Sequence, residues 1–262
     1  MAPIHREADP CSERVSDAAL GTPVRLLSTG PDWCRLRTPD GYEGYARTPG
    51  LRPCAAARAR AFAGGMVVQA VSSELRFAVP GRPGLHLPAG ARVVRVRTAA
   101  RRTLVELPDG SRGHLPSGAL ARPGRFSRRS LVENALRFTG VPYVWGGRTG
   151  WGLDCSGLVQ LAAELAGTAL PRDARDQVRR GSAVGLSRAQ ALRAGDLLFF
   201  GKSDSSITHV AIYLGAAKYV HAFGQVRVNS LRPQDVDYLD ELPGYFRCAR
   251  RLPESPSGGA AR

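Results

Sequence analysis

The sequence predicts an α+β protein in which two small β-barrels precede a larger domain of helices and antiparallel strands. Three observations carry this prediction: an internal repeat in the first half, helical periodicity after Pro123, and several apolar strand-like runs after Gly195. The 262 residues are 43% hydrophobic and 23% charged, which excludes a largely disordered chain. No apolar run is long enough to span a membrane, so we expect no membrane partner.

The repeat has one fixed offset. Residues 38–51 read TPDGYEGYARTPGL and residues 107–120 read LPDGSRGHLPSGAL, and Pro-Asp-Gly in each is a strong signal for a hairpin turn. Short alternating or apolar runs flank both turns, as expected for small barrels. We therefore predict barrels over residues 1–54 and 55–124. The residues that recur 69 positions later are Pro39, Asp40, Gly41, Gly44, Leu51, Gly21 and Val24.

The second half predicts helices first and strands afterwards. Ser130 and Glu133 have the spacing of a capping box, so we expect a helix that starts there and ends at Gly140. A second helix is expected from residue 155 to Gly167, and a short one from Asp173. The strand-like runs are LLFF, HVAIYLG, KYVHAF, VRVNS and YFRCARR. These elements predict a domain over residues 125–252 and a disordered tail over 253–262.

Cys155 lies where a helix is expected to begin. Asp154 directly before it can cap the helix, and the unpaired N–H groups and helix dipole at that position favour a thiolate. The Gly-rich loop ahead of it leaves the sulfur reachable. A buried core cysteine is the ordinary alternative. We assign that alternative to the other four cysteines, Cys11, Cys34, Cys54 and Cys248.

Two histidines follow this cysteine on strands that a tight turn connects. His209 opens HVAIYLG and His221 lies in KYVHAF, so a hairpin through residues 215–218 places the two rings side by side. A thiolate nucleophile needs a base, and the base needs an orienting partner. The spacing therefore predicts a Cys-His-His catalytic set. The remaining histidines, His5, His86 and His114, fall in the barrel half.

These residues stand in motifs that resemble the NlpC-type papain-like cysteine peptidases of bacterial cell walls. The motifs are YVWGG at 143–147, DCSG at 154–157, GDL at 195–197, THVA at 208–211 and VHA at 220–222. The resemblance implies that Cys155 is the nucleophile, His209 the base and His221 the third polar residue. It implies hydrolysis of γ-D-glutamyl to diamino acid bonds in murein (peptidoglycan) stem peptides. No metal and no organic cofactor is implied.

The barrels resemble bacterial SH3 domains, two of which precede the catalytic domain in some members of this family. In those members an acidic segment and a tyrosine of the first SH3 domain wall the site, and the substrate has a free N-terminal L-Ala. By this resemblance Glu13 and Tyr42 contact the substrate, although hairpin packing is an alternative role for Tyr42. The second repeat has Ser111 in place of that tyrosine.

The resemblance also implies further substrate-binding residues in the catalytic domain. Asp154 would both cap the helix and bind the ammonium of the substrate. A buried pair of Glu13 with Asp154 would favour binding of a peptide with a free N-terminal amine. Where the family often has Asp-Ser, this chain has Asp173-Ala174, so one hydrogen bond to the ammonium is missing. The full set is Tyr143, Trp145, Asp154, Ser156, Asp173, Glu13 and Tyr42.

Charge and cysteine usage exclude other classes of protein. The net charge is +15, with 37 Lys and Arg against 22 Asp and Glu. The arginines are scattered without an aromatic-studded basic strand, which argues against a nucleic-acid partner. Five cysteines without CxxC spacing predict neither a disulfide framework nor a zinc site. The N-terminus has no apolar signal segment, so we expect a cytoplasmic enzyme that recycles imported wall fragments.

Two alternatives to a peptidase stay open from the sequence. One is a non-catalytic wall-binding protein that uses its SH3 repeats. The other is an amidase or acyltransferase on the same papain-like scaffold, because one nucleophile site can serve several acyl transfers. The sequence does not specify the oligomeric state or the diamino acid.

Overall fold

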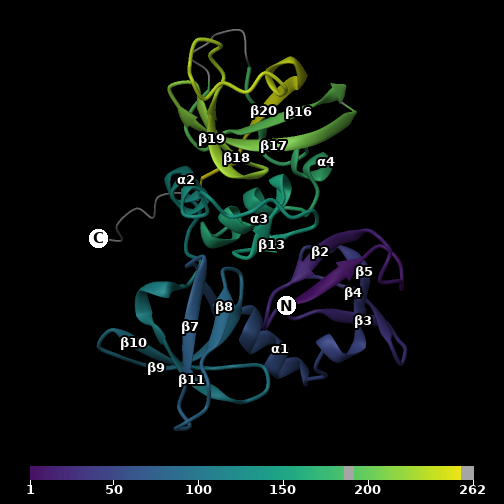
Figure 1. Cartoon of the computed structure of the whole chain (residues 1–262), viewed down its shortest axis with the longest axis vertical. Coiled ribbons are helices and arrows are strands. Elements are labelled where there is room, and N and C mark those ends of the chain that lie inside the picture. The colour runs from purple at the N-terminus through teal and green to yellow at the C-terminus, as the bar shows by residue number, and fades with distance from the viewer. Residues whose placement is uncertain (186–191, 204, 255–262) are drawn as a thin grey trace, which may run out of the picture.

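The computed structural model describes residues 1–185, 192–203 and 205–254, and it divides into two small sheets below a larger α+β part (Figure 1). The first sheet has the strand order β2-β1-β5-β4-β3. Its core is a small cluster that includes Ile4, Leu36 and Ala46. The strands are β1 (Ala2–His5), β2 (Arg14–Ala18), β3 (Arg25–Thr29), β4 (Trp33–Arg37) and β5 (Glu43–Arg47), followed by the 3-10 helix η1 (Thr48–Gly50).

Helix α1 (Ala56–Ala63) leads into the second sheet, which has the order β12-β6-β9-β10-β11-β7-β8. Its interior is a separate cluster that includes Val93, Val105 and Leu115. The strands are β6 (Met66–Val68), β7 (Ser72–Phe77), β8 (Leu85–Pro88), β9 (Arg92–Ala99), β10 (Arg102–Glu106), β11 (Arg112–Pro116) and β12 (Leu120–Ala121), with η2 (Ser117–Ala119) before β12.

The predicted repeat is visible as two hairpins of the same geometry. Strands β10 and β11 begin and end 69 positions later in the sequence than β4 and β5, respectively. In the first hairpin Thr38 N–H donates to the carbonyl of Tyr42 at 2.9 Å, and in the second Leu107 N–H donates to Ser111 at 2.9 Å. The two SH3-like sheets confirm the fold class predicted for the first half.

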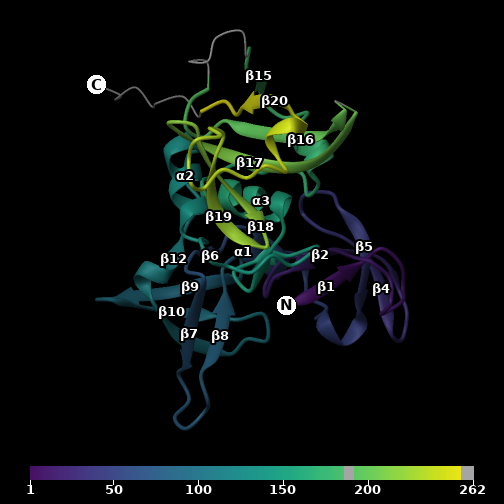
Figure 2. The ribbon, with the colours of Figure 1, turned by 45° about the horizontal axis from the view of Figure 1, so that its top comes forward.

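The remaining part packs helices against one antiparallel sheet of order β15-β20-β16-β17-β18-β19. Helix α3 lies between this sheet and the two barrels in both views (Figures 1 and 2). The elements are α2 (Arg128–Leu136), β13 (Arg148–Thr149), β14 (Gly152–Leu153), α3 (Cys155–Leu165), α4 (Ala174–Gln177), β15 (Ser182–Ala183), β16 (Leu197–Ser203), β17 (Ser206–Gly215), β18 (Lys218–Phe223), β19 (Gln225–Ser230), η3 (Pro243–Tyr245) and β20 (Phe246–Arg251).

One sequence-based expectation for this part needs correction. Helix α2 is capped by Ser127, whose Oγ accepts from the N–H of Ser130 at 3.1 Å, so the capping box at Ser130 is wrong. The helix begins three residues earlier than predicted, so the N–H of Ser130 lies in its first turn. The Ser127 side chain satisfies this N–H, which has no partner within the helix. Most of the predicted tail lies outside the described residues. Glu254, the last described residue, accepts from the N–H of Arg128 at 3.0 Å and pairs with that side chain.

Buried ion pairs join the second barrel to the larger part. Glu164 of α3 accepts from Arg92 of the second sheet and from Arg148 of β13, and each of these side chains is at least four-fifths buried. A cavity of about 450 Å³ lies at this junction and is lined by residues of both barrels and of α3. None of the described helices is long and apolar enough to cross a membrane.

A glycine at the contact between the barrels tests this packing. Gly21 has φ +76° and a Cβ there would lie 2.2 Å from the carbonyl oxygen of Arg92, whereas Gly41 has φ +87° with no atom within 4 Å. Gly41→Ala is expected to lower the free energy of unfolding by only about 1–2 kcal/mol, the cost of the left-handed backbone.

Gly21→Ala carries the same backbone cost and must also push the two barrels apart, so its loss in stability should be clearly larger. Urea unfolding of both variants measures the difference. Equal losses would contradict the barrel contact described here.

Candidate active site

The start of α3 is fixed by its cap. Asp154 is the N-cap residue, and its Oδ1 accepts from the N–H of Gly157 at 2.7 Å, as the sequence predicts. A Cβ on Gly157 would lie 2.0 Å from the carbonyl oxygen of Gly147, so only glycine allows the preceding loop to lie on the first turn. Cys155 is therefore held at the helix start with 8% of its surface exposed.

The loop before α3 is also pinned to the first barrel. Gly146 N–H donates to Asp154 Oδ2 at 3.0 Å. Its φ is +73°, and a Cβ there would lie 2.6 Å from the carbonyl oxygen of Arg14 on β2. The YVWGG loop thus fills the space between the helix start and the first barrel, which explains why two glycines occur together.

The two histidines form a hydrogen-bonded relay across β17, β18 and β19. His209 Nε2 and His221 Nδ1 are 2.9 Å apart, and His221 Nε2 is 3.0 Å from Asn229 Oδ1. Asn229 Nδ2 donates to the carbonyl of Asp237 at 2.6 Å, so its Oδ1 must accept from His221. His221 Nδ1 is then unprotonated and accepts a hydrogen bond from the N–H at His209 Nε2. His209 Nδ1 is left as an acceptor.

Cys155 lies beside the strand that carries His209. The backbone N–H groups of Val210 and Ser156 donate to its sulfur and lower the pKa of the thiol. Burial has the larger effect, and together with the charge of Asp154 it raises the pKa of Cys155 to about 12. The helix start alone favours a thiolate, as the sequence suggests, but in the closed resting site desolvation dominates.

Burial acts on the histidines in the same direction, toward the neutral form. It lowers the pKa of His209 to about 3, with a further contribution from the neighbouring His221. Burial also lowers the pKa of His221 to about 4, although its hydrogen bond to Asn229 opposes the shift. Burial therefore favours the uncharged form of the Cys155 thiol and of both imidazoles.

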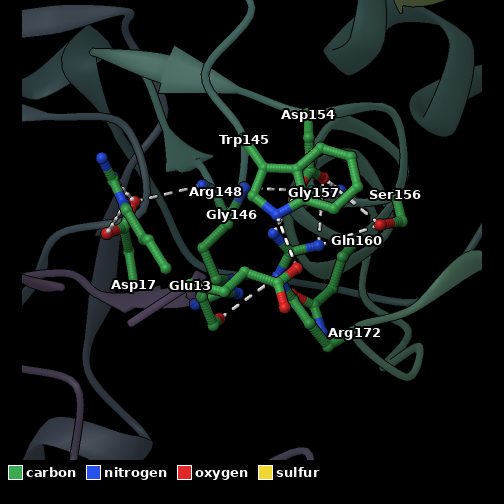
Figure 3. Close-up of polar contacts among 12 residues, drawn as sticks. Glu13, Asp17, Trp145, Gly146, Arg148, Asp154, Ser156, Gly157, Gln160 and Arg172 are labelled. Atoms are coloured by element: carbon green, nitrogen blue, oxygen red, sulfur yellow. Dashed lines mark hydrogen bonds and ion pairs between the residues drawn. The ribbon is translucent and has the colours of Figure 1, made fainter. Parts of the chain in front are cut away.

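Arg172 is a central residue that sequence reasoning missed. Its side chain is 1% exposed and pairs with Asp154 through two bonds, Nη1 to Oδ1 at 3.0 Å and Nη2 to Oδ2 at 2.5 Å (Figure 3). Nη1 also donates to Ser156 Oγ at 2.9 Å, and Nε donates to Ser16 Oγ on β2 at 3.2 Å. One guanidinium thus connects the residues on both sides of Cys155 to the first barrel.

The structure does not form the expected buried pair of Glu13 with Asp154. Asp154 is saturated by Arg172 and by two backbone N–H groups. The Glu13 side chain is 38% exposed and accepts from Arg6 at 2.6 Å and from Trp145 Nε1 at 2.9 Å (Figure 3). Each carboxylate already has its own cation, so the two do not combine into a negative pocket.

Glu13 and Tyr42 nevertheless lie on the wall that faces Asp173. Burial raises the pKa of Tyr42, and the charge of Asp173 raises it further. Asp173 accepts from Arg175 at 2.8 Å, and the pKa of Arg6 is raised mainly by its hydrogen bond to Glu13 and slightly by Asp173. Groups of both signs therefore lie near Tyr42, namely the carboxylate of Asp173 and the guanidiniums of Arg6, Arg172 and Arg175.

The same hairpin is tied to the nucleophile helix. Gln160 on α3 donates from Nε2 to Asp40 Oδ2 at 2.6 Å, and Asp40 is two residues before Tyr42. Tyr143 lies on the other side, where burial and then Cys155 and Asp154 raise the pKa of its phenol, so that it keeps its proton. Of the predicted residues, Tyr143 and Ser156 thus lie next to Cys155, whereas Trp145 contacts Glu13 and Tyr42 lies near Asp173.

No signal in the sequence marked Arg172 or Asn229. Arg172 stands between Pro171 and Asp173 in a loop, where most arginines are exposed. Asn229 acts on His221 because His221 pairs with Arg227 and places Asn229 on the same face, two residues further along β19. That register is visible only in the folded sheet. Within the described part of the chain no cluster of His, Cys, Asp and Glu could hold a metal ion.

Two family models match separate parts of the chain. A model of the NlpC/P60 family matches residues 140–239, and a model of the bacterial dipeptidyl-peptidase SH3 domain matches residues 4–51. The chain carries an NlpC/P60 domain behind a bacterial dipeptidyl-peptidase SH3 domain. The NlpC/P60 match includes Cys155, His209 and His221, and the SH3 match includes Glu13 and Tyr42.

Individual relatives extend the likeness over different lengths. Dipeptidyl-peptidase 6 of Lysinibacillus sphaericus is 29% identical over 92% of this chain and 93% of its own length. The γ-D-glutamyl-L-lysine dipeptidyl-peptidase of Bacillus subtilis is 39% identical, over 45% of this chain and 40% of its own. A crystal structure of an NlpC/P60 family protein from Bacillus cereus superposes with a TM-score of 0.80 at 24% identity, over 92% of this chain and 83% of that one, which shows a shared fold.

The neutral histidines predict a pH dependence of stability. In the folded protein the pKa values of His209 and His221 lie far below the value near 6.5 of an unfolded chain, so the unfolded state binds more protons as the pH falls. The contribution of the two histidines to the free energy of unfolding is fully present above pH 6.5. Below that pH it should decrease by up to about 1.4 kcal/mol per pH unit for each histidine.

Chemical unfolding between pH 6.5 and 4.5 measures this slope. His209→Gln should flatten it, whereas His86→Gln, at an exposed site on β8, should leave it unchanged. A slope that is the same in all three proteins would contradict the buried neutral relay.

Proposed function

We propose that this protein is a cysteine endopeptidase that hydrolyses the γ-D-glutamyl to diamino acid bond of murein stem peptides with a free N-terminal L-Ala. The observation that carries the proposal is Cys155 at the start of α3, beside the strand that bears His209 and the relay to His221. The names of the relatives, a dipeptidyl-peptidase and a γ-D-glutamyl-L-lysine dipeptidyl-peptidase, support the substrate class.

The first chemical step is a proton transfer followed by attack. His209 Nδ1 takes the proton of the Cys155 thiol, and the sulfur attacks the γ-carbonyl carbon of D-glutamate. The developing oxyanion accepts from the backbone N–H of Cys155 at the helix start and from the hydroxyl of Tyr143, which is protonated. Burial opposes charge separation between the sulfur and the ring, so in this proposal the proton transfer is coupled to the attack on the carbonyl.

The acyl-enzyme then forms and breaks. The imidazolium of His209 gives its proton to the amine of the diamino acid, the C–N bond breaks, and a thioester to Cys155 remains. His209 next takes a proton from water, which attacks the thioester and releases the dipeptide with a free γ-carboxylate. His221 and Asn229 keep the ring of His209 in the tautomer that presents Nδ1 in both half-reactions.

Recognition of the peptide end is proposed for the wall made by the first barrel. An L-Ala-γ-D-Glu unit carries an ammonium and the α-carboxylate of D-glutamate, so it is zwitterionic. The set of Glu13, Asp173, Arg6 and Arg175 around Tyr42 offers both signs of charge. The ammonium is assigned to the carboxylates, because Ala174 provides no hydroxyl there. Asp154 takes no direct part in this scheme, since Arg172 neutralises it.

Because the proposed substrate has a free N-terminal amine, it is a peptide that has already been released from the glycan. In this proposal the Tyr42 hairpin and Trp145, which donates to Glu13, block the side on which an amide-linked glycan would extend. The proposed role is therefore the degradation of released wall peptides in cell-wall recycling, and not cleavage of stems still attached to glycan.

The catalytic assignments predict a ranking of activity losses. Cys155→Ala and His209→Ala should each lower kcat by roughly 10⁵-fold or more, and His221→Ala by about 10⁴-fold, because the third residue only orients the base. Mass spectrometry of an L-Ala-γ-D-Glu-L-Lys digest measures turnover, and an unchanged thermal melt shows that each variant folds.

Cys34→Ala is the matched control, since Cys34 is a buried cysteine of the first barrel away from α3 and should leave kcat unchanged. Turnover by Cys155→Ala, or near-native kcat in His221→Ala, would refute the corresponding role.

The wall assignments predict selection for a free amine. Acetylation of the tripeptide should lower kcat/KM by at least about 100-fold, because the ammonium loses its carboxylate partners. In Tyr42→Ala we expect a moderate loss for the free tripeptide and a smaller discrimination against the acetylated one.

Ser111→Ala, at the equivalent position of the second barrel, is the control and should keep the discrimination of the parent. Equal kcat/KM for the free and acetylated tripeptides in the parent enzyme would exclude this mode of recognition while leaving the peptidase chemistry intact.

A further inference from the structure

The second barrel has a positively charged hollow on its outer face. The hollow measures about 220 Å³ and is lined by Arg97, Ala99, Arg102, Leu104 and His114. No acidic residue lines it. The hairpin of β9 and β10 that forms one side projects from the molecule on the side away from β17 and β18 in both views (Figures 1 and 2). The hollow is therefore separate from the candidate active site.

The strand register explains why these side chains meet. Leu104 of β10 is paired with Arg97 of β9 and with His114 of β11, and Arg102 is paired with Ala99. Directly paired residues project from the same face of a sheet, and residues two apart along a strand do so as well. The alternate residues Val93, Thr103, Val105 and Leu115 face the barrel interior and are buried.

The charge of this hollow is uncompensated within the described part of the chain. Neither Arg97 nor Arg102 makes a hydrogen bond or ion pair there. The acidic residues nearby on the same sheet are already engaged, since Glu106 pairs with Arg58 and Arg112 and Glu74 pairs with Arg76. Two further arginines, Arg95 and Arg101, are exposed on the same β9–β10 hairpin.

The first barrel shows that the hollow is not a general property of the fold. At the position of Arg102 it has Trp33, whose ring lies 5.4 Å from that of His5 and 5.2 Å from the guanidinium of Arg47. At the positions of Arg97 and His114 it has Ser28 and Tyr45. The two copies share a backbone and differ on this face, so the basic hollow belongs to the second copy alone.

We propose that this hollow binds phosphate groups of a phosphodiester polymer whose units carry no aromatic base, such as a polyol phosphate chain. Guanidinium groups bind phosphate oxygens in pairs, and two of them with an imidazole converge here. The apolar lining is aliphatic, so it gives bases no surface for stacking, which argues against a nucleic acid. Arg101, at the tip of the same hairpin, extends the charge to a neighbouring phosphate of the chain. Binding there leaves the peptide groove open.

The test exchanges the hollow for its counterpart in the first barrel. The variant Arg97→Ser with Arg102→Trp and His114→Tyr carries residues that the same hairpin already accommodates, so it should fold and should hydrolyse the free tripeptide at the parent rate. A fluorescent glycerol phosphate oligomer is titrated into the full-length protein at several salt concentrations. We expect at least about a tenfold weaker Kd in the exchange variant and a salt slope reduced by about one to two.

Two controls make the result decisive. Arg25→Ser with Arg137→Ser removes the same formal charge from exposed sites elsewhere and should bind like the parent. Arg102→Gln tests the hollow by a single change and should weaken binding several-fold. The proposal is overturned if the exchange variant binds like the parent, or if the charge-matched control loses as much affinity. A single-stranded DNA of equal charge that binds more tightly than the glycerol phosphate oligomer, with loss in the exchange variant, would also overturn it.

Discussion

One buried ion pair, Arg172 with Asp154, holds the functional half of the molecule together. Asp154 caps the nucleophile helix, receives the YVWGG loop and faces a guanidinium that also reaches Ser156 and, through Ser16, the first barrel. A buried charge that lost its partner here would cost several kcal/mol, roughly 3–5, so all these contacts must form together. The geometry around Cys155 is therefore a property of two domains and not of the catalytic domain alone.

Burial explains how this site keeps a nucleophile without exposing a permanent thiolate. Helix N–H groups and the Val210 N–H favour the charged sulfur, but removal from water outweighs them and raises the pKa of Cys155. The same desolvation lowers the pKa of His209. Burial thus works against the thiolate, which is the reactive form of a cysteine. In the proposed mechanism a bound substrate excludes water and provides the carbonyl carbon that the sulfur attacks as its proton moves to His209.

The sequence was sufficient for features that depend on neighbours in the chain. The cap at Asp154, the hairpin turns at Asp40 and Asp109, and the two-barrel α+β architecture follow from local chemistry and from the repeat. It was insufficient where residues far apart in the chain meet. Arg172 reaches Ser16 across 156 positions, and Asn229 reaches His221 through a strand register. The expected pairing of Glu13 with Asp154 failed for the same reason, because their nearer partners, Arg6 and Arg172, could not be identified from spacing.

The hydrogen bond between Gln160 and Asp40 has a consequence for how the groove can move. Gln160 belongs to the helix that begins at Cys155, and Asp40 belongs to the turn that carries Tyr42. The turn that carries Tyr42 is thus linked directly to the helix that begins at Cys155. In the proposed enzyme this link holds the wall at a set distance from the sulfur. Such an enzyme would select its substrates by excluding a chain end that is too large, and not by closing on one that fits.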